Sequence, residues 1–294
     1  MYAKFSPKLS AVPDYCFANC TNLGGLDSDN NIKSVGDYSF YNCKNLKSAN
    51  FLGNANKVLT YIGDYAFAGS GLSSIIINLK GSISDSSTNT HCFANCKELT
   101  SVDMTNSTYL ADHMFDGCSM LQKVHLNNYH SYINEYAFAN CTTLTSMTFP
   151  AKTYMLPDHM FDGCTNLMEV KFEEPSDLKY LGEAAFANCP RLTSITLPKS
   201  VDSLEYLDPA FLSGSSINKI VFTGMSDSIF EEEVQKEIQV DFKPHTWYES
   251  PGSKIKNILN TCHDKHLPMF INLGNGNNHC GCCSTWWSYV VETV

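Results

Sequence analysis

The sequence predicts an α/β repeat solenoid, in which each unit of 22–27 residues contributes one short strand and one helical turn. Three observations lead to this fold class. A segment of the form D-x-x-F-x-N/G-C recurs nine times between Asp14 and Gly214, its Phe returns at regular intervals, and an alternating apolar run follows most copies. Units of this length cannot fold alone, so each must bury its apolar face against its neighbours.

The recurring Phe marks the centre of each unit, and we expect it in the core. The nine residues are Phe17, Phe40, Phe67, Phe93, Phe115, Phe138, Phe161, Phe186 and Phe211.

An acidic residue stands three positions before the Phe in eight copies, where it suits an N-cap that accepts backbone N–H groups of a short helical turn. We therefore assign these acids a structural role. They are Asp14, Asp37, Asp64, Asp112, Glu135, Asp158, Glu183 and Asp208. Two positions after the Phe, eight copies carry Asn or Gly, which tolerate the left-handed conformation that ends a helix.

A Leu or Ile then opens each strand. The runs "LTSVDM", "LTSMTF" and "LTSITL" alternate apolar and polar residues, which predicts a strand with one buried face. One strand per unit should stack into a parallel sheet.

Most of the thirteen cysteines occupy one slot, three residues after the Phe. Ser70 and Gly214 fill this slot in two copies, which favours a small buried side chain over a requirement for sulfur. We predict buried free thiols, and no metal, at Cys20, Cys43, Cys96, Cys118, Cys141, Cys164 and Cys189, and likewise at Cys16 and Cys92, one residue before the Phe.

The units resemble the BspA-like class of leucine-rich repeats, whose consensus runs approximately L-x-x-I-x-I/L-P-x-x-V/L-x-x-I-G/P-x-x-A-F-x-x-C. "LTSITLPKSVDSLEYLDPAF" and "LTSMTFPAKTYMLPDHMF" follow it, and the match covers roughly residues 10–223. The resemblance implies a leucine-rich-repeat solenoid over residues 1–223, located at a cell surface or secreted, whose repeats serve adhesion or protein binding without catalysis.

Exposed strand positions and irregular connections are the expected binding surface. The connections Asn50 to Tyr61 and Asn78 to His91 depart from the repeat, and we interpret both as tolerated insertions. Outward aromatic residues are candidate contacts, whereas the single histidines lack ligand spacing. The aromatic candidates are Tyr109, Tyr129, Tyr132 and Tyr154, and the histidines are His113, His125, His130 and His159.

The sequence predicts an acidic capping helix over residues 224–242, with Ile229, Phe230, Val234 and Ile238 on one face. It predicts a linker over residues 243–253. Residues 254–294 predict a small α/β segment in the order helix, strand, C-x-x-C, helix. Its stretch "LPMFINLGNGNNHCGCC" resembles the redox site of thioredoxin-like proteins. The resemblance implies that Cys280 is the attacking thiolate and Cys283 the resolving one.

The segment departs from that family because His279 replaces the usual Trp, Cys282 adds a thiol, and the second half of the fold is absent. Two other interpretations stay open, an irregular structural tail and a zinc site. The zinc site would draw on Cys262, His263, His266, His279, Cys280, Cys282 and Cys283.

The composition of the chain limits the classes of binding partner that we expect. Thirty acidic against twenty basic residues give a net charge of −10, and no Lys/Arg run forms a phosphate-binding stripe, so we expect no nucleic-acid partner. No apolar run is long enough to span a membrane. The start shows no signal peptide, which leaves an intracellular or virion origin open. Both ends stop inside repeating or folded patterns, so we expect a piece of a larger polypeptide or ends covered by partners.

Two functions are consistent with these sequence features. The first is a solenoid that binds a protein or glycan partner without catalysis or cofactor. The second is a thiol–disulfide oxidoreductase that uses Cys280 and Cys283, with the repeats as a targeting arm.

Overall fold

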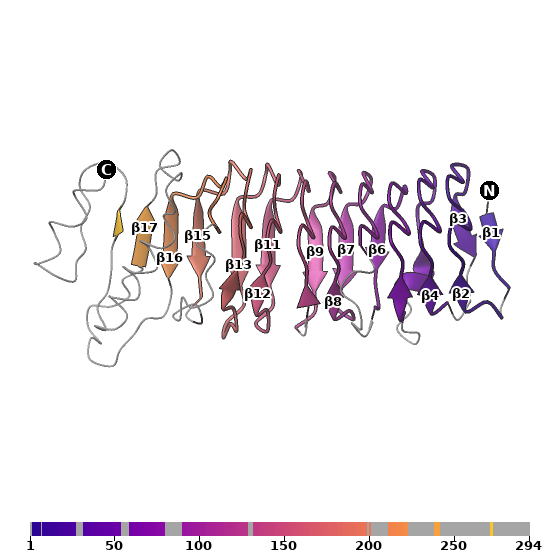
Figure 1. The fold of residues 1–294 in the computed structure, drawn as a ribbon, viewed down its shortest axis with the longest axis horizontal. Helices are drawn as coiled ribbons and strands as arrows, with labels where there is room; N and C mark the ends of the chain where they lie inside the picture. The colour runs from indigo at the N-terminus through magenta and orange to yellow at the C-terminus, as the bar shows by residue number, and fades with distance from the viewer. Residues whose placement is uncertain are drawn as a thin grey trace, which may run out of the picture.

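The computed structural model describes residues 2–6, 8–27, 32–53, 59–79, 90–128, 132–198, 200, 211–222, 238–241 and 271–272. These residues form stacked coils that run in one direction along the long axis of the molecule (Figure 1). The predicted linker, most of the predicted capping helix, and Cys280 with Cys283 lie outside the described residues.

Each regular coil contributes two strands, whereas the sequence predicted one. The longer strands form one row and the two-residue strands a second row below it in Figure 1. The long row holds β1 (Tyr2–Lys4), β3 (Gly25–Asp27), β6 (Ser74–Ile76), β7 (Ser101–Met104), β9 (Lys123–Leu126), β11 (Ser146–Phe149), β13 (Glu169–Phe172), β15 (Ser194–Leu197) and β16 (Lys219–Phe222). The short row holds β2 (Ala11–Val12), β4 (Ser34–Val35), β5 (Tyr61–Ile62), β8 (Tyr109–Leu110), β10 (Tyr132–Ile133), β12 (Met155–Leu156) and β14 (Tyr180–Leu181).

Strands within each row pair in parallel, as predicted, because every coil repeats the direction of the one before it. Val102 pairs with Val124 and Met147 with Val170, so like side chains stack in the interior. The two-residue strands escaped prediction because alternation cannot be recognised over two residues.

The helical turn predicted for each unit is wrong in the described residues, where the D-x-x-F-x-N/G segment is a series of tight turns. The N–H groups of Tyr15, Phe17 and Asn19 donate to carbonyls of the next coil at 2.7–2.8 Å, while Ala18 N–H closes a turn onto Tyr15 O. A helix would direct all of these donors along its own axis. Three of these four donors instead join coil to coil.

The Phe residues form the centre of the core, as predicted. Phe40 through Phe211 are buried in every coil, and Phe17 is partly exposed in the first. Successive rings from Phe17 to Phe186 stack with centroids 4.9–5.9 Å apart. Each ring therefore loses water contact on both faces to its two neighbours, and coil stacking carries the burial.

A second row of stacked rings follows the acids. Tyr15, Tyr38, Tyr65, His91, His113, Tyr136 and His159 stack with centroids 4.3–5.1 Å apart. All seven have φ between 50° and 56°, in the left-handed region. This conformation costs energy for residues other than Gly, and the stacking and the N–H bond to the next coil offset that cost. The Asn and Gly two residues after the Phe also have positive φ, as predicted.

Five of the acids, all aspartates, act between coils, which corrects their predicted N-cap role, and Asp208 lies outside the described residues. Asp14 Oδ1 accepts the backbone N–H of Asp37 at 2.9 Å, and Asp158 Oδ1 accepts that of Glu183 at 2.8 Å. With no helical turn present, no helix N-terminus needs a cap, and the acceptor serves the following coil instead. The structural role is thus confirmed with a different partner.

The repeat cysteines are free and, from Cys43 onward, buried, as predicted. Cys16 and Cys20 are exposed, which corrects their predicted burial, because no described turn segment stacks on the outer side of theirs. The slot also has a polar function that the sequence did not reveal. Cys43, Cys141 and Cys189 each donate S–H to the carbonyl of the preceding coil's Phe at 3.0–3.3 Å. Burial raises the pKa of Cys43 to about 11 and that of Cys189 to about 12.

The first irregular connection is partly packed. Residues Asn50–Gly53 form the 3-10 helix η1, with Phe51 and Leu52 buried. In the second, Asn78 and Leu79 are buried, and Leu79 bridges to Leu59. Residues 54–58 and 80–89 lie outside the described residues. These segments therefore contribute to the core as well as to the surface.

Residues Ile238–Asp241 form β17, antiparallel to β16, although the sequence predicted the end of a helix there. Ile271–Asn272 form β18, which pairs in parallel with β17. The alternation Ile238-Gln239-Val240-Asp241 fits a strand as well as a helix end, so the spacing of Ile238 alone misled the prediction.

Candidate binding groove on the short-strand face

The candidate site lies at a seam, a place where two neighbouring coils are not joined by strand pairing. Among the described strands, β10 and β12 do not pair, and neither do β9 and β11 of the same two coils. The turn segments of these coils stay joined, since Phe138 N–H donates to Met160 O at 3.0 Å. The coils therefore separate on the strand faces only.

Pro157 explains the seam on the short-strand face. In the equivalent position of neighbouring coils, Asn134 N–H donates to Leu110 O at 3.0 Å and Gly182 N–H to Leu156 O at 2.8 Å. Proline has no N–H to donate at this rung, so the ladder from β10 to β12 is interrupted.

A groove of about 560 Å³ opens along this seam. Its volume lies within the usual range of ligand sites. The apolar part of its lining consists of Ile133, Tyr154, Met155, Pro157 and Tyr180. The polar part consists of Asp112, Asn134, Glu135 and Asp158. We call these nine residues the acidic groove.

Three carboxylates and no Lys or Arg line the acidic groove. Asp112 Oδ1 accepts Glu135 N–H at 3.1 Å, which holds that carboxylate at the groove edge. Burial raises the pKa of Asp112, while the bond from Glu135 N–H and the charge of His113 oppose this shift. Glu135 is exposed. The groove thus combines an apolar floor with three carboxylates and one amide, Asn134.

The four tyrosines predicted as outward contact residues differ in their positions in the structure. Tyr154 lines the groove and is 51% exposed, as predicted. Tyr109 is buried, which corrects its predicted outward position. Its hydroxyl accepts a hydrogen bond from Asn134 Nδ2 at 3.1 Å, and burial raises its pKa to about 12. Tyr132 belongs to β10, and Tyr129 lies outside the described residues.

Sequence reasoning missed Met155, Tyr180 and the second use of the acids. A signal was present, because "YLAD", "YINE", "MLPD" and "YLGE" repeat a Tyr or Met, a Leu or Ile, a variable residue and an acid. In the structure the first residues of these segments align, with Tyr132 beside Tyr109 and Tyr180 beside Met155.

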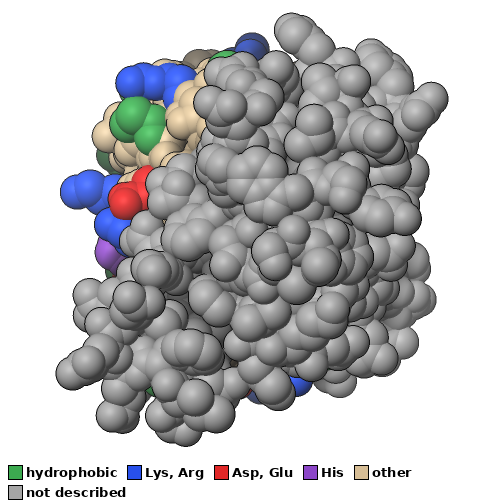
Figure 2. Space-filling view, turned by 90° about the vertical axis from the view of Figure 1, so that its left-hand side faces the viewer, with side chains coloured by type: hydrophobic (Ala, Val, Ile, Leu, Met, Phe, Trp, Pro, Cys, Tyr) green, Lys and Arg blue, Asp and Glu red, His purple; other side chains and the backbone are tan. Residues whose placement is uncertain are grey.

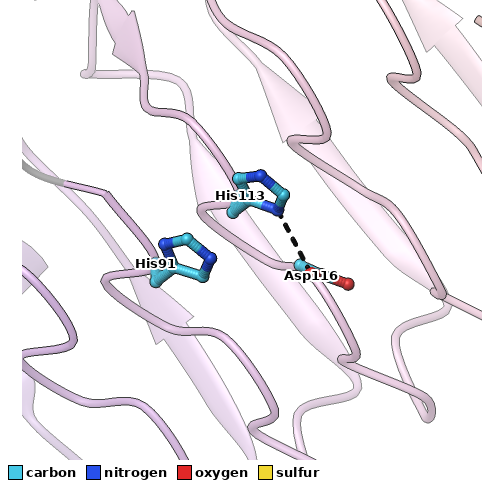
Figure 3. A group of neighbouring side chains, drawn as sticks. All are labelled: His91, His113 and Asp116. Carbon is cyan, nitrogen blue, oxygen red and sulfur yellow. Dashed lines mark hydrogen bonds and ion pairs between the residues drawn. The ribbon is translucent and has the colours of Figure 1, made fainter. Parts of the chain in front are cut away.

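His91, His113 and Asp116 also lie together (Figure 3). His113 Nδ1 is 3.2 Å from Asp116 Oδ2. However, the two imidazole rings stack with centroids 4.3 Å apart and planes inclined by 7°. An imidazole binds a metal ion in its own ring plane, and two nearly parallel stacked planes share no such point. We therefore assign the cluster to the ring stack. His125 is exposed on β9, His159 belongs to the stack, and His130 lies outside the described residues.

The ring stack predicts a loss of stability in mild acid. Burial, followed by the charge of His113, lowers the pKa of His91 below its ordinary 6.5. The unfolded chain therefore binds this proton more readily, and unfolding becomes easier as the pH falls through 6.5. We expect His91→Tyr to weaken this dependence by at most one bound proton, because the variant removes one titrating group. Tyr should fit the slot, since Tyr65 and Tyr136 occupy it in other coils at a similar φ.

Urea unfolding of both chains between pH 7.5 and 5.5 measures this effect. His125→Tyr, on an exposed strand position, is the matched control and should leave the slope unchanged. Identical slopes for the chain and for His91→Tyr would contradict the prediction.

Seen from the C-terminal end, described Lys or Arg, Asp or Glu, His and hydrophobic side chains lie close together at the margin (Figure 2). In the described part of the chain, no helix is long and apolar enough to cross a membrane.

The fold defines a class of protein, a parallel solenoid of the leucine-rich-repeat type that carries a surface groove. The family model for the BspA type leucine rich repeat region matches residues 2–89 and 86–218, so the chain belongs to this family. No curated protein matches it.

The chain is similar to several solved leucine-rich-repeat structures, and the one from Bacteroides ovatus shows the same fold. A leucine-rich repeat protein from Bacteroides ovatus is 24% identical, with a TM-score of 0.50 over 76% of this chain and 66% of that one. The Treponema pallidum leucine rich repeat protein is 21% identical (TM-score 0.42, 65% of this chain and 77% of that one). A leucine rich cell surface protein from Faecalibacterium prausnitzii is 17% identical (TM-score 0.40, 75% and 47%). The chain thus spans about two thirds of the Bacteroides protein and less than half of the Faecalibacterium protein.

Proposed function

We propose that this chain is a non-catalytic interaction module that binds a protein partner through the acidic groove. The observation that carries the proposal is the seam at Pro157, where the regular stack opens into a groove with an exposed tyrosine on an apolar floor. Tyr gives a large contact area at a small entropic cost, which suits recognition. Membership of a repeat family, whose scaffold presents surfaces to partners, supports this function.

The described residues do not favour an enzyme. The buried repeat thiols are held as hydrogen-bond donors to backbone carbonyls, and burial raises the pKa of Cys141 and Cys164 far from the thiolate range. Cys280 and Cys283 lie outside the described residues, and the comparisons give no support to a thioredoxin-like segment over 254–294.

We further propose that the module acts in adhesion at a cell surface or after secretion, as the family resemblance suggests. The free thiols are compatible with such a compartment, because burial protects Cys43 through Cys189 from oxidants.

Selection from a random peptide display library on the immobilised full chain tests the function. We expect enrichment on the chain and its loss on Tyr154→Ala, with Tyr2→Ala as the control at another exposed tyrosine. A glycan array is run in parallel. Peptide enrichment that is insensitive to Tyr154, or groove-dependent binding of glycans alone, would contradict protein binding at this groove.

A further inference from the structure

The charges of the acidic groove identify the kind of partner, and this inference rests on the proposed function. Asp112, Glu135 and Asp158 come from three successive coils. Backbone hydrogen bonds join these coils beside the acids, from His113 N–H to Glu135 O at 3.0 Å and from Tyr136 N–H to Asp158 O at 3.2 Å. Segments bonded in this way lie about 4.8 Å apart, so the acids form a row roughly 10 Å long. Such a row matches a short segment of extended chain, which rises about 3.3 Å per residue.

Hydrogen bonds from the backbone do not neutralise the negative charge of these acids. Asp112 and Asp158 each use Oδ1 to accept the N–H of the following coil's acid, at 3.1 and 2.8 Å. Neutral N–H donors do not cancel a full charge, and the residues that line the groove include no Lys or Arg. Three like charges beside an apolar floor repel one another, and a bound cation relieves this repulsion.

Tyr154 offers an aromatic surface on which a cationic side chain can bind. Its side chain is 51% exposed at the groove, next to the apolar Met155. An aromatic face attracts a guanidinium or ammonium group, and Arg also stacks on it. The apolar floor accommodates the methylene stems of the same side chains.

We propose that the acidic groove binds an extended cationic segment of a protein partner, with Arg or Lys side chains placed on Tyr154 and between the carboxylates. A glycan would also stack on Tyr154. Neutral sugars do not compensate three carboxylates, and anionic glycans are repelled by them, so the charges favour the peptide.

Titration of fluorescent octa-arginine against the full chain tests the proposal. The groove variant is Glu135→Gln with Tyr154→Ala, and the matched control is Glu173→Gln with Tyr2→Ala, which makes the same changes at exposed residues outside the groove. We expect saturable binding that weakens as salt rises. The groove variant should weaken it at least about ten-fold and the control less than about two-fold. A Gly-Ser octapeptide and chitotetraose serve as neutral probes.

Equal binding of octa-arginine to the two variants would assign it to the net charge of the chain and overturn the proposal. Groove-dependent binding of chitotetraose without octa-arginine would overturn it in favour of a glycan. The absence of octa-arginine binding would also overturn it, while display selection separately decides whether the groove binds protein. Enriched peptides that depend on Tyr154 but lack basic residues would leave the proposed function standing without this partner class.

Discussion

Replacement of Phe138 by Ala should lower the free energy of unfolding by about 3–5 kcal/mol, the range observed when a buried aromatic side chain is truncated. Phe138 is fully buried and stacks between Phe115 and Phe161 at 5.6 and 5.9 Å. The coil segment cannot collapse into the space, because the N–H groups of residues 136, 138 and 140 tie it to the next coil. Urea unfolding followed by circular dichroism measures the change.

Phe17→Ala is the matched control, since Phe17 has the same role in the first coil but is partly exposed. Its loss should be clearly smaller than that of Phe138→Ala. Equal losses at the two positions would contradict a core that is carried by stacking between coils.

The cysteine slot should tolerate a small donor and reject a larger side chain. Cys141 is fully buried and donates to Phe115 O at 3.3 Å. We expect Cys141→Ser to cost less than about 1 kcal/mol, because a hydroxyl makes the same bond. Cys141→Leu should cost about 1–3 kcal/mol, since it overpacks the column and leaves that bond unmade.

The same urea titration distinguishes these variants. A natural precedent supports the expectation, because Ser70 occupies the slot three coils earlier in the column and lies 3.3 Å from Cys96 Sγ. A Leu variant as stable as the Ser variant would show that the slot is a loose apolar space and that the S–H bonds contribute nothing.

Much of the repeat architecture was predictable, because its signals are local and recur. The Phe anchors, the parallel strands, the buried thiols from Cys43 onward and the left-handed Asn or Gly each depend on residue type and period, and the structure confirms them.

The helical turn was wrong for a physical reason. Tyr or His after the acid adopts positive φ, which sequence reasoning expects chiefly of Gly and Asn. Ring stacking and the N–H bond to the next coil offset the strain at Tyr38 and His113, and these partners are about two dozen residues away. The acids misled for the same reason, since a carboxylate suits an N-cap and an acceptor between coils equally well.

The groove was only partly predictable. Tyr154 was identified as a contact from its residue type, whereas Pro157 acts through a hydrogen bond that it fails to make across the stack. Its effect becomes visible only when the equivalent Asn134 and Gly182 rungs are compared. Tyr109 shows the converse, because an apparently outward tyrosine is buried by its neighbours.

Hydrogen exchange of the full chain with and without octa-arginine tests the central claim most directly. If the acidic groove is the binding surface, amide exchange should slow in residues 132–135 and 154–158, while the long-row strands β7 and β15 exchange unchanged. Protection confined to the long-row strands, or spread evenly over the chain, would contradict the assignment of binding to this groove.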